Sequence, residues 1–284
     1  MTAAGDAAPR IRRVLVALDA SADSQAALEA SAALAAVLGA ELLGLFVEDA
    51  DLARLAGSPL SAEIDFLSGE RRPLAPAHLE RQLRARAARA RQALEREAAR
   101  RRLAWTFRTA RGRVSAEILA ADADLITLGH RGHSPRRGPG STVQALLAGA
   151  GAPVLVSRRG VGLGRSVFAL DDGSPAARRA LVLAAELAHR HRLPWTHLVV
   201  PANEAPAEGE ARSRELPAGE AGGEVAGGAP RTLSLATLDA AGLAAVAARE
   251  GCGLLVLPRD GATLGPDGVS RLLRLARCPL LLVG

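Results

Sequence analysis

Several residue types are absent or scarce in this chain, and each absence argues against a class of function. The 284 residues include no lysine, so every one of the 36 strongly basic residues is an arginine and the P-loop GxxxxGK[ST] of ordinary nucleotide triphosphatases cannot be formed. Tyrosine is also absent, and two Trp and four Phe leave few aromatic rings for stacking the bases of a single strand. We therefore expect neither a P-loop enzyme nor a nucleic-acid partner.

Cysteine and long apolar runs are equally scarce. The two cysteines, Cys252 and Cys278, form no CxxC motif and have no nearby histidine, which argues against a metal or redox site. No apolar run reaches the length of a membrane span, and the N-terminus lacks a charged-then-apolar signal pattern. These features predict a cytoplasmic protein with no membrane partner. The formal net charge of +6 is modest, and most of the arginine excess lies in one helical segment, where a solvated face is the simpler explanation.

Strands and helices alternate regularly through the first half of the chain. After a tail at residues 1–9 that we expect to be disordered, the apolar patterns predict strands at 14–18, 41–47, 103–109, 125–128 and 153–156, and helices at 25–38, 78–102, 114–121 and 143–148. Such alternation predicts an α/β fold with a parallel sheet covered by helices on both faces. Residues 48–76 fit this pattern poorly, and we interpret them as an inserted lid or partner surface.

The same pattern begins again after a short linker at 159–164. VFALD at 167–171 parallels VALD at 16–19, and the closing segments GAPVLVS and RCPLLLVG align directly. We interpret this as an internal duplication, with a first domain at 10–158 and a second, shortened and degenerate domain at 165–284. Residues 202–230 are rich in Ala, Gly, Glu and Pro and predict a flexible loop.

A glycine-rich basic loop, residues 129–140, stands between a buried strand and a helix in the first half. Ser141 and Thr142 follow at the position expected for a helix N-cap. Glycines, free backbone N–H groups and a helix N-terminus together make an anion site, so this loop is predicted to hold phosphates, with Arg131, Arg136 and Arg137 as clamps. The alternative is a tight connection in which the glycines only permit the turn.

Three further observations concern this region. His130 and His133 have the spacing of a metal pair but lack a third ligand, so phosphate contact or solvent exposure is preferred. Asp19 ends a buried strand where such folds bind ligands, which favours ligand or Mg²⁺ contact over helix capping. The matching loop of the second half carries Asp260 and Asp267, whose charges would repel phosphate.

With these motifs the chain resembles a tandem member of the universal stress protein family. The resemblance rests on VLVALDASADSQAALEASAALAAVLGAELLGLFVED, on Gly129-x-x-Gly132 with Gly140-Ser141, on APVLV at 152–156, and on VFALDDGSPAARRALVLAAELA and CPLLLV in the second half. It implies two Rossmann-like domains of the adenine nucleotide alpha hydrolase type, each with a five-stranded parallel sheet. ATP, with Mg²⁺ as an open question, would lie across the carboxyl ends of the first and fourth strands. The cofactor-binding residues would be Ala17, Leu18, Asp19, Val47, Gly129, Arg131, Gly132, Gly140, Ser141 and Thr142.

One departure from the family pattern bears on this expectation. Gly132 and Gly140 enclose seven residues, whereas the ATP-binding members have nine, so the loop could close around phosphates or have lost the pocket. The resemblance also implies that the two closing strands pair within the chain as a pseudo-dimer, with a further homodimer left open.

Three functions follow from these observations. The first is a stress-response or regulatory protein that binds ATP in its first domain, is not an enzyme, and has a structural second domain. The second is an interaction protein of the same fold that binds an unknown protein partner instead of a nucleotide. The third is an adenylating enzyme, which ranks last because Asp19-Ala20-Ser21-Ala22-Asp23-Ser24 lacks the glycines of an SGGxDS turn. Whether a bound ATP would be hydrolysed is undecided.

Overall fold

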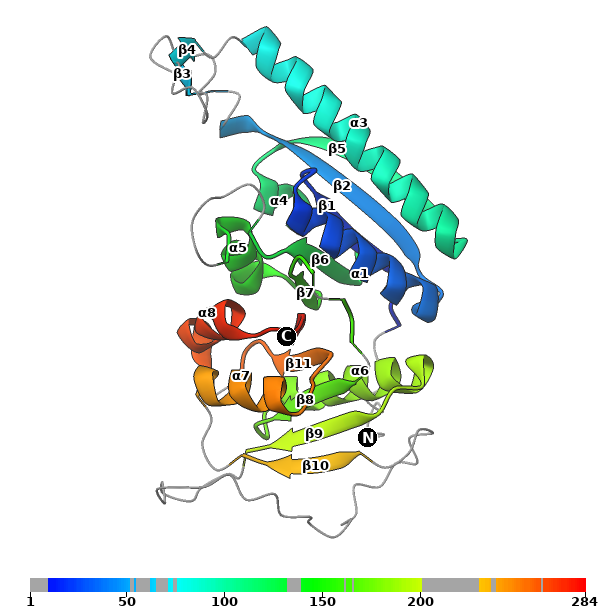
Figure 1. Ribbon diagram of the computed structural model, residues 1–284, viewed down its shortest axis with the longest axis vertical. Coiled ribbons are helices and arrows are strands. Elements are labelled where there is room, and N and C mark those ends of the chain that lie inside the picture. Colours follow the sequence, from blue (N-terminus) through cyan, green and yellow to red (C-terminus); the bar gives the residue numbers. More distant parts are fainter. Residues whose placement is uncertain are drawn as a thin grey trace, which may run out of the picture.

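Ten strands from both halves of the chain form one continuous sheet in the computed structural model (Figure 1). The structure describes residues 10–51, 54, 62–64, 71–73, 76–131, 139–160, 162–164, 166–200, 230–235, 239–261 and 263–284. The strand order is β10-β9-β8-β11-β12-β7-β6-β1-β2-β5, so each half contributes five adjacent strands. All pairings are parallel except the one that joins the halves. The predicted α/β class is confirmed, and the five parallel strands of each half join into a single sheet.

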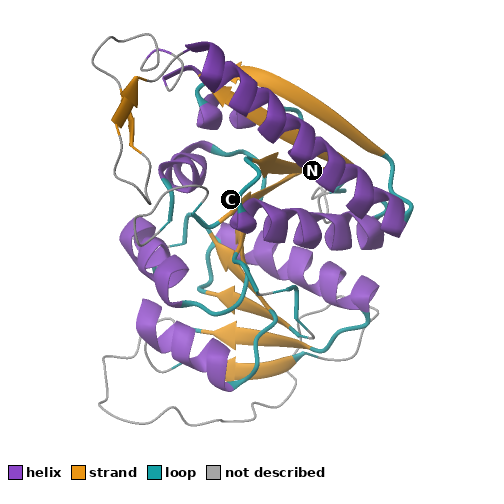
Figure 2. Ribbon diagram, turned by 45° about the horizontal axis from the view of Figure 1, so that its top comes forward, coloured by secondary structure: helices purple, strands orange, loops and turns teal. Residues whose placement is uncertain are grey.

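The first half places the carboxyl ends of its central strands at one edge. Its elements are β1 (Arg13–Leu18), α1 (Ala22–Leu38), β2 (Glu41–Asp49), the small hairpin β3 (Ala62–Ile64) and β4 (Arg71–Pro73), α3 (Pro76–Arg101), β5 (Trp105–Gly112), α4 (Val114–Leu119), β6 (Leu125–Gly129), α5 (Ser141–Gly149) and β7 (Val154–Ser157). Strand β1 lies between β2 and β6. Because α1 returns the chain across one face and α4 and α5 cover the other, the strand ends are left open between them (Figures 1 and 2).

The second half repeats this arrangement in shorter form. It comprises β8 (Val167–Asp171), α6 (Pro175–His191), β9 (Trp195–Val199), β10 (Arg231–Ser234), α7 (Ala240–Arg249), β11 (Leu254–Pro258), α8 (Gly265–Leu275) and β12 (Leu280–Val283). Strand β10 and helix α7 were not predicted. The strand has only four residues, and α7 consists mostly of alanine, so neither carries a strong hydrophobic period of its own.

Capping residues determine where helices α1 and α6 begin and where α1 ends. Ser21 accepts a hydrogen bond from the Ser24 amide at the start of α1, and Ser174 does the same for Ala177 at the start of α6. Helix α1 ends at Gly39, whose φ of 67° is the left-handed conformation that glycine adopts at low cost. Polar turns after β1 and β8 therefore begin helices at equivalent places in both halves.

Closing strands β7 and β12 join the two halves. They pair antiparallel, with Leu155 opposite Leu281, and both side chains are fully buried. This is the pairing that the family resemblance implied for the pseudo-dimer. Two buried clusters, one on each face, run through both halves, and helices α1, α3 and α6 line one face while α4, α5, α7 and α8 line the other (Figure 2). Much of the hydrophobic core is therefore continuous across the junction.

Several predicted features lie outside the described residues: the tail at 1–9, nearly all of the 202–230 loop, and most of the 48–76 insertion. Within the described part of the chain, no helix has the length and apolarity that crossing a membrane requires.

Candidate functional site

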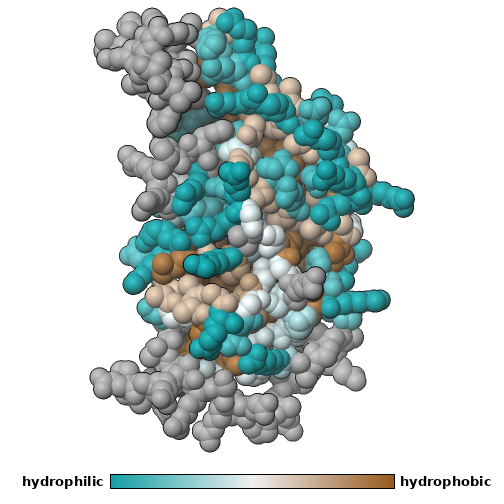
Figure 3. Space-filling model, viewed as in Figure 1, coloured by the Kyte–Doolittle hydropathy of each residue, from teal (hydrophilic) through white to brown (hydrophobic). Residues whose placement is uncertain are grey.

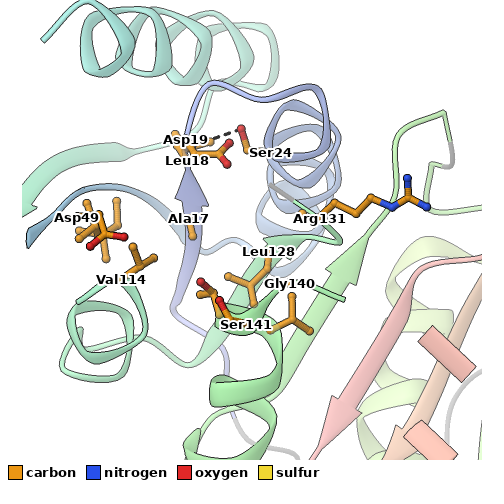
Figure 4. Close-up of a pocket in the computed structure, with 15 residues that line it drawn as sticks. Ala17, Leu18, Asp19, Ser24, Asp49, Val114, Leu128, Arg131, Gly140 and Ser141 are labelled. Atoms are coloured by element: carbon orange, nitrogen blue, oxygen red, sulfur yellow. Dashed lines mark hydrogen bonds between the residues drawn. The ribbon is translucent and has the colours of Figure 1, made fainter. Parts of the chain in front are cut away.

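A cleft of about 350 Å³ opens at the carboxyl ends of β1, β2 and β6, beside the first turn of α5 (Figure 4). Nine of the ten predicted binding residues line it, and the tenth, Gly132, lies outside the described residues. Six lining residues were not predicted, namely Ser24, Leu45, Asp49, Val114, Leu128 and Val143. The structure therefore gathers one cleft from segments more than 120 residues apart in the sequence.

Helix α5 supplies backbone N–H groups at one end of the cleft. The prediction that Ser141 or Thr142 caps this helix is wrong, because the N-cap is Gly140 and Ser141 is the first helical residue. Glycine has no side chain that could accept a hydrogen bond, so no N-cap side chain satisfies the backbone amides of the first turn of α5. The Gly140 amide donates to the His130 carbonyl at 3.1 Å, which closes the neck of the glycine-rich loop. An anion in this place would meet free N–H groups and the positive end of the helix dipole.

Gly129, the last residue of β6, lets this strand approach helix α1 closely. A Cβ atom at this position would stand 2.6 Å from the backbone carbonyl carbon of Asp23, where no real Cβ fits. The carboxylate of Asp23 in turn accepts a hydrogen bond from the Arg131 amide at 3.1 Å. Glycine at 129 and aspartate at 23 therefore fix the direction in which the loop leaves β6.

Asp19 lines the cleft just after the end of β1 and is not the N-cap of α1. Ser21 is the N-cap, and the Asp19 carboxylate accepts the Ser21 amide at 2.8 Å in a local turn. Since successive side chains of a strand alternate between faces, Ala17 and Asp19 face the cleft while Leu18 packs in the cluster beneath α1. Leu18 would therefore offer its backbone to a ligand.

The far end of the cleft, away from α5, is built by β2 and α4. Leu45, Val47 and Asp49 alternate along β2 and line the same wall, and Val114 at the start of α4 stands beside them (Figure 4). The two-residue period from Val47 would have been enough to find Asp49 in the sequence. No local sequence pattern identifies Val114 as a lining residue. The connection from β5 to α4 places it at the cleft.

His130 differs from its prediction because it is buried, with 2% of its surface exposed. Neither ring nitrogen makes a hydrogen bond within the described part of the chain. Burial, with the nearby charges of Arg158 and Arg131, lowers the pKa of His130, while the Leu273 carbonyl and Asp23 partly oppose that shift. The buried His130 side chain thus lies close to Leu273 of α8, in the second half.

Arg158 connects the same region to the second half. Its guanidinium donates to the carbonyl of Ala276, the C-cap residue of α8. A cation at a helix C-terminus is favoured by the helix dipole. The region beside the glycine-rich loop is therefore attached to the other domain directly.

In the second half, the side chains at the equivalent strand end are paired with one another. Asp171, the counterpart of Asp19, pairs with His197 at 3.0 Å. Asp172 accepts from the Ser174 amide at 3.1 Å and from the Thr263 hydroxyl at 3.0 Å, and these hydrogen bonds lower its pKa despite partial burial. Carboxylates there are already satisfied and would repel an anion.

The two cysteines, far apart in sequence, come together at the start of β11 and before β12. Interaction with Cys278 raises the pKa of the Cys252 thiol, and burial adds to this effect. Both are free thiols, and Cys278 is buried in the core. Among the described residues, no group of three His, Cys, Asp or Glu side chains is placed to hold a metal ion.

These features define the first half as an α/β module in which a helix begins in the crevice of a parallel sheet. Residues 10–158 match the Universal stress protein family, and the chain belongs to this family. A universal stress protein from Archaeoglobus fulgidus DSM 4304 is similar over both halves, with 16% identity, 95% of this chain and 97% of that chain covered, and a TM-score of 0.65.

A second similar structure is the functionally unknown protein PA1789 from Pseudomonas aeruginosa PAO1. It shares 13% identity over 96% of this chain and 92% of its own, with a TM-score of 0.59. A search of curated proteins found no match. At these identities the two structures show the fold of a tandem member of the family.

Proposed function

We propose that the chain is a regulatory or stress-response protein of the cytoplasm that binds an adenine nucleotide, ATP, in its first half. The observation that carries this proposal is the polarity of the 350 Å³ cleft. One end offers the first-turn amides of α5 and the Arg131 residue, and the other end offers Leu45, Val47 and Val114. Triphosphate would occupy the first end and the base the second.

The helix end at Gly140, the side chain of Arg131 and the carboxylate of Asp19 are suited to a nucleotide with its Mg²⁺ ion. Gly140 has no Cβ, and the nearest atom to a Cβ built there is the Arg131 carbonyl oxygen at 3.6 Å, so the helix end is not crowded by its neighbours. Arg131 is exposed, and Figure 4 shows its guanidinium directed away from the other lining residues, so it would contact a terminal phosphate after a change of rotamer. Asp19 is the residue that would hold Mg²⁺, since carboxylate oxygen is the ligand this ion prefers.

The second half takes a structural role in this proposal. The side chains at its equivalent strand end are paired with one another, and its β12 completes the sheet through β7. We propose binding without dedicated catalysis, because the described residues that line the cleft include no histidine to serve as a general acid or base.

A second candidate is a protein-interaction module that uses α3. This helix carries eight arginines and three glutamates over 26 residues, and Figure 3 shows hydrophilic side chains along its outer side. Arg81, Arg89 and Arg96 are exposed and have no ion pair among the described residues. Their charge would suit an acidic protein segment.

A thermal-shift titration with calorimetry separates the two candidates. The full chain, first freed of carried-over ligand, is titrated with Mg-ATP, ADP and AMP. At about 100 times the dissociation constant, a ligand adds ~2.7 kcal/mol to the stability of the state that binds it, which is a shift of several degrees for a domain of this size. Absence of a shift or heat with all three nucleotides would refute the proposed function and leave the second candidate.

A matched pair of variants tests the location. Gly140→Asp places a carboxylate at the N-cap of α5, where it favours helix formation but stands where phosphate would bind. Gly268→Asp makes the same change in the first turn of α8, in the second half. We expect the first variant to fold and lose ATP affinity by at least ~100-fold, since two like charges 4 Å apart repel by about 4 kcal/mol near a protein surface. The second variant should bind ATP like the wild type, and loss of binding there would mean that the site lies in the other half.

A further inference from the structure

A second cleft, of about 360 Å³, lies between helices α1 and α3, and we call it the α1–α3 cleft. The two helices pack against each other on one face of the sheet (Figure 1). Leu18 and Ser24 line both this cleft and the cleft at the strand ends, whereas Asp19 lines only the latter and Ala20 only the α1–α3 cleft. The α1–α3 cleft therefore has walls of its own, and its volume falls in the range of small-molecule sites.

Small side chains leave the space that forms the α1–α3 cleft. Ala22 of α1 lines it opposite Ala90 and Ala93 of α3, and larger residues at these positions would fill it. Leu18 and Ala90 are buried in the hydrophobic core and line the cleft with apolar atoms. The inner lining is therefore suited to the hydrocarbon part of a ligand.

Two arginines of α3, Arg89 and Arg96, line the same cleft, and its described lining includes no acidic residue. Both are exposed, and neither makes an ion pair within the described part of the chain. They are seven positions apart, so they lie on one side of the helix, about 10 Å from each other along its axis. The cleft thus carries two separated positive charges beside an apolar lining.

The sequence of α3 explains why these two charges are not neutralised by the helix itself. A helical arginine finds a local partner when an acidic residue stands three or four positions away, as Glu80 does for Arg84. No position three or four residues from Arg89 or Arg96 is acidic. Their guanidinium groups are therefore available to an external anion, and the planar fork of arginine matches a carboxylate.

We propose that the α1–α3 cleft binds a small dicarboxylate with a hydrocarbon middle, one carboxylate at Arg89 and the other at Arg96. The hydrocarbon chain would lie against Leu18 and Ala90. Two arginines balance the charge of two carboxylates. A phosphate group carries about −1.5 to −2 charges at neutral pH, so two phosphates would exceed it. This site is separate from the proposed nucleotide site and does not depend on it.

Isothermal titration calorimetry of the full chain at constant ionic strength tests the proposal, with suberate and succinate as probes. Suberate is long enough to reach both arginines at once, whereas succinate is a shorter dicarboxylate of the same charge. We expect suberate to bind at least ~10-fold more tightly than succinate, because only suberate gains charge-assisted hydrogen bonds at both ends. A variant with both Arg89→Gln and Arg96→Gln should lose at least ~10-fold in suberate affinity for the same reason.

Matched variants separate the cleft from the general charge of α3. Arg81→Gln with Arg91→Gln removes the same charge from exposed positions of this helix outside the lining, and should bind suberate like the wild type. Ala93→Leu fills the cleft without changing the charge and should weaken suberate binding. Ala85→Leu, at an exposed position outside the lining, should not.

Four results would overturn the proposal. They are no binding of suberate to the wild type, equal affinities for suberate and succinate, equal losses in the two double arginine variants, and loss of suberate binding in the presence of saturating Mg-ATP. The last result would place suberate in the cleft at the strand ends, while the proposed nucleotide site would stand. Suberate binding that persists with saturating Mg-ATP and falls in Ala93→Leu supports the α1–α3 cleft as a second site.

Discussion

Replacement of Gly129 by alanine tests how the glycine-rich loop is attached to α1. The new Cβ would lie 2.6 Å from the carbonyl carbon and 2.8 Å from the carbonyl oxygen of Asp23, whereas ordinary contact begins at 3.4 Å. The obstacle is backbone, so β6 and the first turn of α1 would have to separate by about 0.8 Å, the difference between 3.4 and 2.6 Å. Overpacking of this kind costs ~1–3 kcal/mol.

The same separation would strain the bond from the Arg131 amide to the Asp23 carboxylate, which is 3.1 Å long. A hydrogen bond to a charged group contributes about 1.5–3 kcal/mol when it is well formed, and its exposed position here places it at the low end. Together these terms predict that Gly129→Ala loses ~2–4 kcal/mol in the free energy of unfolding. ATP affinity should also fall, because the loop would leave β6 in a different direction.

Urea unfolding followed by circular dichroism measures the loss directly. Gly151→Ala is the control, because a Cβ there has no atom within 4 Å and its φ is not in the left-handed region. That variant should lie within ~1 kcal/mol of the wild type, on the stabilising side if the chain entropy of the unfolded state dominates. A Gly129→Ala protein as stable as the wild type would refute the close approach of β6 to α1.

Two further predictions concern the rest of the fold. The pKa of His130 is lowered in the folded state, so the unfolded chain takes up a proton first as the pH falls below ~6.5. The wild type should therefore lose stability in that range, and the His130→Asn variant should lose less. Urea unfolding at pH 7.5 and 5.5 measures both losses, and equal losses in the two proteins would contradict the prediction. Gly253→Ala should lower the free energy of unfolding by ~1–3 kcal/mol, since its Cβ would stand 2.5 Å from the backbone of Gly164, while Gly162→Ala, with open space around it, should not. Equal stability of these two glycine variants would show that the contact between Gly164 and Gly253 is not close.

The sequence predicted the strands and helices of the first half well because their apolar periods are strong. Strand β1 differs from its expected bounds by one residue and β2 by two, and α3 begins two residues before the predicted start. Prediction failed where local signals were weak, at β10 and α7, and where a helix start was judged from hydroxyl side chains alone at Ser141. Nine of the predicted binding residues came together because six of them lie at or near the ends of parallel strands, which meet at one edge of a sheet, and the other three begin helix α5 at that edge.

What the sequence by itself determined is the order and type of most elements, the duplication and the position of the glycine-rich loop, since these follow from local period, turn residues and self-similarity. Only the tertiary structure decided which side chains share a cleft, that His130 is buried near α8, and that Cys252 meets Cys278. It also decided that Asp171 pairs with His197 and that Asp172 accepts a hydrogen bond from Thr263. The reason is physical: periodicity records which face of an element is apolar, whereas burial and hydrogen-bond partners depend on which distant strands and helices that face is packed against.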